Sequence, residues 1–121
     1  MFLNLSNHPL EKWSPAQLLA ARELGGGAIA TITFPNVPPA ASTEEVAEMA
    51  KSLTAMIVGD FVEPGVAMVQ GEFSMTWEMT RRLLALGWSV VVATSDRKVI
   101  EGADGTKTVT FDFVKFRAVR N

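Results

Sequence analysis

The single histidine of the chain lies in a polar tripeptide that follows a short apolar run near the N-terminus. The run Phe2–Leu5 is long enough for a strand and too short for a helix, and Ser6, Asn7 and His8 follow it. Pro9 cannot donate to a strand ladder and favours extended or turn geometry at His8. Hydroxyl, amide and imidazole groups at a strand end can bind a ligand, and the imidazole can also transfer a proton. The alternative is that Ser6 and Asn7 only cap a turn and His8 is a solvated loop residue.

Two later apolar runs also end in polar clusters with chemical potential. The run 66–69 is followed by Gln70, Gly71 and Glu72, and the run 88–93 by the cluster 94–97. Gly71 would allow a ligand close to the backbone, and the helix expected after it would offer free N–H groups to an anion. The second cluster supplies hydroxyls for ribose or phosphate oxygens and a guanidinium that can hold phosphate in two contacts; its members are Thr94, Ser95, Asp96 and Arg97.

The elements that must position these clusters alternate between strands and helices. Apolar runs predict strands at about 2–6, 28–34, 66–70 and 89–94. Ser14-Pro15 with Gln17 and the box Ser42 to Glu45 predict helix starts, and a third helix is expected over about 74–86. The tail predicts a hairpin around Asp104-Gly105. We therefore expect a single Rossmann-like three-layer α/β domain over residues 1–121, with a mainly parallel sheet and a C-terminal antiparallel hairpin.

The parallel arrangement would bring the three polar clusters to one edge of the sheet. Ligands of open parallel sheets bind beyond the carboxyl ends of the strands, which makes this edge the candidate site. The hairpin carries more apolar side chains than one sheet face needs, and their alternation predicts a bulge or burial on both faces. These residues are Val109, Phe111, Phe113, Val114 and Phe116.

Composition narrows the classes of function. The 121 residues carry no cysteine and a net charge of −2, so thiolate chemistry and long nucleic acid are not expected. A small anionic ligand held by a local cluster of donors stays open. No GxGxxG or GxxxxGK[ST] pattern is present, and the glycines 25–27 follow a helix instead of preceding one. We therefore expect no metal site and no nucleotide cofactor. No apolar stretch approaches the roughly 20 residues of a membrane span and no targeting segment is visible, so a cytoplasmic location is expected.

Three segments together resemble a known group of proteins. They are Leu3-Asn4-Leu5-Ser6-Asn7-His8-Pro9, Val69-Gln70-Gly71-Glu72 and Ala93-Thr94-Ser95-Asp96-Arg97. They look like the small stand-alone CRISPR-associated proteins with a CARF-like Rossmann fold, several of which open with a strand and a Ser-x-His or Ser-His turn. That group includes ring nucleases, which degrade the cyclic oligoadenylate messengers of type III CRISPR systems. Asn7, inserted between Ser6 and His8, departs from the tighter Ser-His form.

The resemblance implies a homodimer that binds a ring of 3′,5′-linked adenylates, with cyclic tetra-adenylate as the first candidate. It implies metal-independent attack of a ribose 2′-hydroxyl on the adjacent phosphate, with Ser6, His8 and Arg97 as the catalytic residues. The ligand would be held by Asn7, Gln70, Gly71, Glu72, Thr94, Ser95 and Asp96. Two alternatives remain open: a sensor or sponge that binds the messenger without cleaving it, and a structural or interaction subunit.

Overall fold

The computed structural model describes all residues from 1 to 121 and contains five strands, three α-helices and one short 3-10 turn. The strands are β1 Phe2–Ser6, β2 Ile29–Thr33, β3 Val66–Gln70, β4 Ser89–Glu101 and β5 Lys107–Val119. The helices are α1 Pro15–Gly25, α2 Thr43–Asp60 and α3 Phe73–Ala85, and the 3-10 turn η1 is Leu10–Lys12. The order of elements is the one predicted from the sequence, except that the predicted fourth strand and the first strand of the hairpin form one strand, β4. No helix combines the length and the apolar character that a membrane crossing requires.

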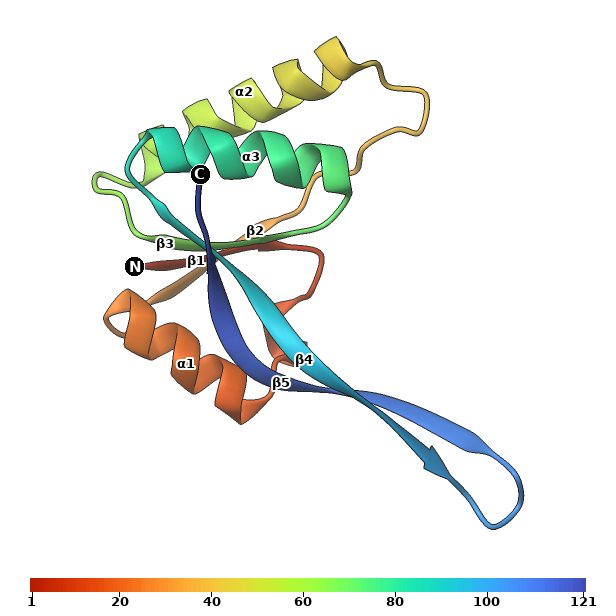
Figure 1. Cartoon of the computed structure of the whole chain (residues 1–121). Coiled ribbons are helices and arrows are strands. Elements are labelled where there is room, and N and C mark those ends of the chain that lie inside the picture. Colours follow the sequence, from red (N-terminus) through yellow and green to blue (C-terminus); the bar gives the residue numbers. More distant parts are fainter.

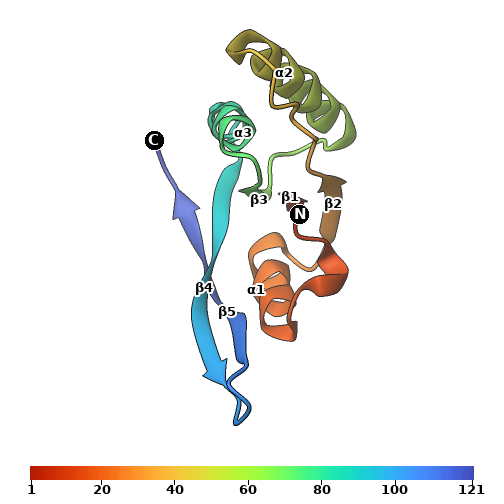
Figure 2. The ribbon, with the colours of Figure 1, turned by 90° about the vertical axis from the view of Figure 1, so that its right-hand side faces the viewer.

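The five strands form one sheet in the order β2-β1-β3-β4-β5. The pairs β1–β2, β1–β3 and β3–β4 are parallel, and β4–β5 is antiparallel. Helices α2 and α3 cover one face and α1 covers the other (Figures 1 and 2). The predicted Rossmann-like three-layer fold is confirmed. Strand order reverses at β1, so the topological switch point, where ligands of such sheets bind, lies between β1 and β3.

The two faces of the sheet differ in polarity. Leu3 and Leu5 of β1 belong to the larger core cluster under α2 and α3, whereas Phe2 belongs to a smaller cluster with residues of α1. Because strand side chains alternate, Asn4 and Ser6 share the α1 face with Phe2. The α1 face is therefore apolar where β1 begins and polar where β1 ends. Polar side chains are therefore available for a site at the carboxyl ends of the strands.

Helices α1 and α2 begin where their sequence signals place them, and α1 also ends at the predicted glycines. The Ser14 hydroxyl accepts a hydrogen bond from Gln17 N–H, and Pro15 is the first residue of α1. Gly26, at φ 74°, ends that helix in the left-handed conformation, so the predicted role of the triple glycine as a helix-to-strand connection is confirmed. Ser42 and Glu45 form the complete predicted capping box of α2.

Strand β4 departs from the prediction because it does not end at Thr94 but continues to Glu101. It pairs with β5 over its whole length, and the ribbon of the two strands extends beyond the sheet (Figures 1 and 2). We call its outer part, residues 95–101 paired with 107–113, the arm. The cluster predicted at a strand end thus lies where the ribbon leaves the body. At this point β4 no longer pairs with β3, but its backbone stays paired with the antiparallel strand β5.

A β-bulge marks the junction between body and arm, as the hairpin pattern predicted. Thr94 is opposite Lys115 and Ser95 is opposite Phe113, so Val114 is the extra residue. Because of the bulge, Phe113 and Phe116 lie on the same face, with ring centroids 5.0 Å apart. The Phe116 ring in turn lies 5.1 Å from Phe2, which ties the base of the ribbon to the core below α1.

Candidate functional site

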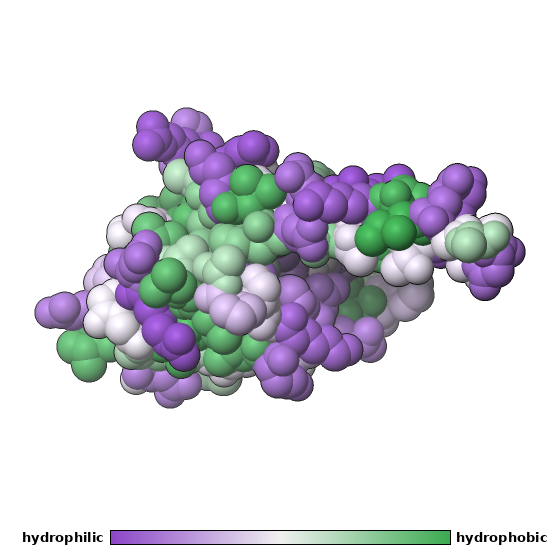
Figure 3. Space-filling model, turned by 90° about the horizontal axis from the view of Figure 1, so that it is seen from below, coloured by the Kyte–Doolittle hydropathy of each residue, from purple (hydrophilic) through white to green (hydrophobic).

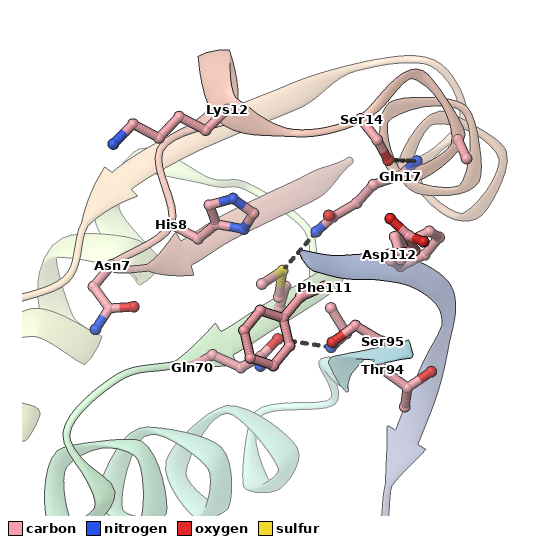
Figure 4. A pocket seen from close by; sticks show the side chains of 14 residues that line it. Asn7, His8, Lys12, Ser14, Gln17, Gln70, Thr94, Ser95, Phe111 and Asp112 are labelled. Atoms are coloured by element: carbon pink, nitrogen blue, oxygen red, sulfur yellow. Dashed lines mark hydrogen bonds between the residues drawn. The ribbon is translucent and has the colours of Figure 1, made fainter. Parts of the chain in front are cut away.

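A cleft of about 530 Å³ opens at the carboxyl ends of β1, β3 and β4, on the face of the sheet that α1 covers. Its volume falls within the roughly 300–1,000 Å³ of small-molecule sites. Viewed from below, polar residues surround a hollow between the body and the arm (Figure 3). Figure 4 shows the lining from close by, and the residues are Asn7, His8, Lys12, Ser14, Ala16, Gln17, Met68, Gln70, Ala93, Thr94, Ser95, Phe111, Asp112 and Phe113.

The turn that carries His8 is held by three side chains that converge on its carbonyl oxygen. The His8 oxygen accepts from Asn4 Nδ2 at 3.1 Å, from Trp13 Nε1 at 3.1 Å and from Ser6 Oγ at 3.3 Å. The Ser6 hydroxyl also accepts from His8 N–H at 3.2 Å and lies 2.5 Å from Asn4 Oδ1. The half-buried imidazole therefore reaches the cleft from a backbone that is fixed by buried polar groups.

This network assigns Ser6 a role different from the contact with ligand that the sequence suggested. Ser6 is 4% exposed and does not line the cleft, and its hydroxyl is engaged within the turn. Its partner Asn4, fully buried, was not singled out from the sequence. The signal that could have found it is a single amide inside an apolar strand, because a buried amide needs hydrogen-bond partners. Ser6 and Asn4 hold the backbone of His8, and neither of them lines the cleft.

Gln70 connects two strands that have begun to separate. The β3–β4 ladder ends at the pair Met68–Val91, and the Gln70 Oε1 atom accepts from Ala93 N–H at 2.6 Å beyond it. The side-chain carbonyl thus takes the place of a backbone acceptor. Its amide nitrogen makes no hydrogen bond within the chain and lines the cleft as a free donor. Gln70 was correctly placed at the strand end by the sequence argument.

Gln17 reaches the cleft although the sequence suggested only a helix-capping role. Its backbone N–H completes the cap on Ser14, but its side chain does not return to Ser14. The side chain is 4% exposed, and its Nε2 atom has a single partner, the Met68 sulfur at 3.8 Å. The predicted helix start at Ser14-Pro15 is confirmed, but the Gln17 amide takes no part in the cap and points to the sheet and into the cleft (Figure 4).

The anion site predicted at the start of α3 is filled by the chain itself. Glu72 caps this helix, and its carboxylate accepts from Ser74 N–H and Met75 N–H, both at 2.9 Å. The hydrogen bond from the Ser74 hydroxyl, followed by those from the two backbone groups, lowers the pKa of Glu72. A second anion would meet a negative charge there. Neither Glu72 nor Gly71 lines the cleft.

Gly71 is required for packing inside the protein. A Cβ atom at this position would overlap the ring of Phe34, which is 9% exposed. Its N–H donates to the Thr76 hydroxyl at 3.1 Å. The close approach that the sequence assigned to a ligand is therefore made by an aromatic side chain of the same chain.

The cluster 94–97 divides between the cleft and the arm. Thr94 and Ser95 line the cleft, although the Thr94 hydroxyl is engaged in the bulge with the backbone of Lys115. Pleating places Asp96 on the opposite face of the ribbon from Ser95. Arg97 does not line the cleft, but it is paired across the arm with Phe111, which lines it. The Arg97 guanidinium forms no ion pair within the chain.

The charged groups of the cleft lie at opposite ends of it. Lys12 lies near Asn7 and His8, whereas Asp112 lies beside Phe111 on the arm (Figure 4). The Asp112 carboxylate is 3.1 Å from Lys98 Nζ, and both side chains are more than half exposed. No three histidine, aspartate or glutamate side chains gather in a metal-binding group. The cleft therefore combines one basic end with a wall of neutral amides, hydroxyls and aromatic rings.

Comparison with known proteins was made along the whole chain. No curated protein and no solved structure gives a significant match. One family model, described as "Uncharacterized protein MJ1673 family", matches residues 1–117. The match includes every residue that lines the cleft and all of the network around His8. The chain therefore belongs to the MJ1673 family.

Proposed function

We propose that the chain binds a cyclic oligoadenylate in this cleft and opens the ring without a metal ion. The proposal rests mainly on one observation: a firmly held histidine and free amide groups from β1 and β3 meet at the switch point of a Rossmann-like sheet. The size of the cleft and the net charge of −2 favour a small ligand over long nucleic acid.

The proposed reaction uses a nucleophile that the ligand itself provides. A ribose 2′-oxygen attacks the adjacent phosphorus, the new 2′-O–P bond forms and the P–O5′ bond breaks. The 2′-hydroxyl proton leaves to solvent, and the departing 5′-oxygen takes a proton from a general acid. The products are linear strands with a 2′,3′-cyclic phosphate at one end and a 5′-hydroxyl at the other.

The residues divide between proton transfer and charge stabilisation. His8 is the general acid, because it is the one imidazole of the chain and its backbone is fixed by three hydrogen bonds: its oxygen accepts from Asn4 and Trp13, and its N–H donates to the Ser6 hydroxyl. Asn7 and Lys12, beside it, hold the phosphate at the basic end of the cleft. Arg97 is unpaired and lies on the arm, outside the lining of its own cleft; it adds charge to the phosphorane of a ring that two copies share.

The proposed active form is a homodimer in which two clefts share one ring. A two-fold ring suits a two-fold dimer, because each donor then occurs twice around the ligand. The β4–β5 ribbon leaves apolar side chains in solvent outside the cleft, as expected of a surface that a second copy covers; Val99, Val109 and Val114 are 43–52% exposed.

The experiment that tests the proposal is incubation with cyclic tetra-adenylate, followed by chromatographic analysis of the products. Linear products should form at the same rate with and without EDTA. Arg97→Ala should lower the rate about a hundredfold, the equivalent of about 3 kcal/mol of transition-state stabilisation, with Arg120→Ala as the matched control. Lys12→Ala should weaken binding, whereas Lys51→Ala on α2 should not.

The alternatives predict different outcomes of the same experiment. If the protein binds the ring but forms no linear products, it is a sensor or sponge and not an enzyme. If it neither binds nor cleaves the ring, the structural or interaction subunit is the alternative that stands. Loss of activity in EDTA, or wild-type cleavage by Arg97→Ala or His8→Ala, would refute the mechanism.

A further inference from the structure

We propose that the end of the cleft formed by Gln17, Gln70 and Phe111 is a nucleobase subsite that accepts a 6-aminopurine. The inference rests on the proposed function to the extent that a nucleotide enters this cleft. It goes beyond that function because it assigns base recognition to residues that the reaction does not use.

The two ends of the cleft fit different parts of a nucleotide. Lys12, His8 and Asn7 lie on one side of the cleft, Gln17 and Asp112 lie on the other, and the Phe111 ring lies next to Gln70 (Figure 4). The first group offers positive charge and hydrogen-bond donors, which suit phosphate. The second contains neutral amides, an aromatic ring and a carboxylate already paired with Lys98, so its lining offers phosphate no free positive charge. A nucleotide therefore fits with its phosphate near His8 and its base near Gln17.

Gln17 is the observation that points to a ligand at this end. The Gln17 side chain lines the cleft and is 4% exposed, and its only hydrogen-bond partner is the Met68 sulfur, 3.8 Å from Nε2. Sulfur is a weak acceptor, and the contact uses only the Nε2 atom. The Oε1 atom has no partner within the chain, and because no buried side-chain oxygen of the protein lacks a partner, Oε1 is open to the cleft. A helix cap does not need a buried amide at this position, because the backbone N–H of Gln17 already supplies the cap.

Gln70 supplies a donor whose orientation is fixed. Its Oε1 atom is held by Ala93 N–H at 2.6 Å, so rotation of the amide by 180° would break that bond. Its Nε2 atom must therefore face outward as a donor. An unpartnered acceptor on Gln17 and a fixed donor on Gln70 complement the N6 amino group and a ring nitrogen of adenine. Guanine would place its O6 acceptor against the Gln17 acceptor.

Phe111 supplies the stacking surface. Its side chain lines the cleft and is 67% exposed. It lies on the same face of the ribbon as Phe113, two residues along the strand, and Phe113 packs against Phe116 in the body. Exposed aromatic rings beside polar groups are the usual platforms for nucleobases. The free ring of Phe111 thus covers a base whose edge faces the two amides.

The test compares AMP with GMP, which differ only in the base, by ligand-observed NMR titration of the full-length protein. AMP should bind about tenfold more tightly than GMP. Gln17→Met preserves side-chain volume next to Met68 and removes the amide, so AMP affinity should fall about tenfold and the preference should disappear. Phe111→Ala should weaken AMP and GMP alike. Ile100→Ala, on the other face of the arm and 60% exposed, is the matched control and should bind as the wild type does.

The outcomes separate this inference from the proposed function. Equal affinity for AMP and GMP, no binding of AMP at millimolar concentration, or unchanged AMP binding by Gln17→Met would overturn the base subsite, even if cyclic tetra-adenylate is cleaved. If Phe111→Ala and Ile100→Ala lose AMP affinity equally, Phe111 acts only in the folding of the arm, and its assignment as the stacking surface is overturned. Conversely, suppose that AMP and GMP bind as expected but the protein does not cleave cyclic tetra-adenylate. The base subsite would then stand, and the proposed ring nuclease activity would be refuted.

Discussion

Replacing Asn4 with alanine should destabilise the protein by about 2 kcal/mol and displace His8. The substitution removes the donor of the 3.1 Å bond to the His8 oxygen and the acceptor that lies 2.5 Å from the Ser6 hydroxyl. Two buried hydrogen bonds at about 1 kcal/mol each give this magnitude. Ser6 can still donate to the His8 oxygen, so the hydroxyl is not left without a partner. With an unfolding entropy of about 2.1 cal/mol/K per residue over 121 residues, the loss lowers Tm by about 8 °C.

Chemical and thermal unfolding monitored by circular dichroism measure this loss. Asn7→Ala is the matched control, because Asn7 is an exposed asparagine in the same turn whose side chain makes no hydrogen bond within the chain; it should change stability by less than about 0.5 kcal/mol. Cleavage by the folded fraction of Asn4→Ala should also fall, since His8 loses a support of its backbone. Equal unfolding midpoints for wild type and Asn4→Ala would contradict the reasoning.

Three further predictions concern packing, pH and assembly. Gly71→Ala should destabilise the fold by about 1–3 kcal/mol, because the added Cβ atom overlaps the Phe34 ring. In a double-mutant cycle, adding Phe34→Leu should recover part of this loss of stability. Additive effects of the two substitutions would argue against the overlap. The lowered pKa of Glu72 means that its stabilising effect is present above the unfolded-state value of about 4.3 and is lost as pH falls through the lower folded value. The difference in unfolding free energy between wild type and Glu72→Gln should therefore shrink between roughly pH 6 and pH 3, and a difference that grew on acidification would reverse the assigned direction. Light scattering at micromolar concentration should give the mass of a dimer, and a monomeric mass would remove the shared-ring arrangement.

The architecture followed from local patterns because the signals for each element agree. Ser14 and Ser42 begin helices in the way that short-range capping chemistry requires, and apolar runs of four to seven residues mark the parallel strands. The bulge was predictable because Phe113 and Phe116 are three residues apart, and an unbroken strand would place them on opposite faces.

The candidate site was predicted only in part, because its key contacts are between residues distant in sequence. The edge of the sheet, with Asn7, His8 and Gln70, followed from the positions of the strand ends. The cap of Gln17 is a contact within one helical turn, whereas its side chain meets Met68 across 51 positions of sequence, and no local pattern shows that.

For Gly71 and Glu72 the sequence suggested a ligand contact that the structure does not support. Their residue types suit an anion site, and only the three-dimensional neighbours show that Phe34 and the start of α3 already use them. The end of β4 at Thr94 was also misplaced. A run of polar residues reads as a strand terminus, yet exposed two-stranded ribbons tolerate polar side chains on both faces.

The continuous ribbon of β4 and β5 has a consequence for hydrogen exchange. Within the body β4 is paired on both sides, with β3 and β5, whereas beyond the bulge each strand has only the other as partner. Amides of the arm should therefore exchange with deuterium through local opening, long before those of residues 89–91, whose exchange requires a much larger unfolding. The boundary between the two regimes falls at the cleft. One wall of the cleft is thus a scaffold that opens only with the domain, and the other is a strand pair that opens independently of it.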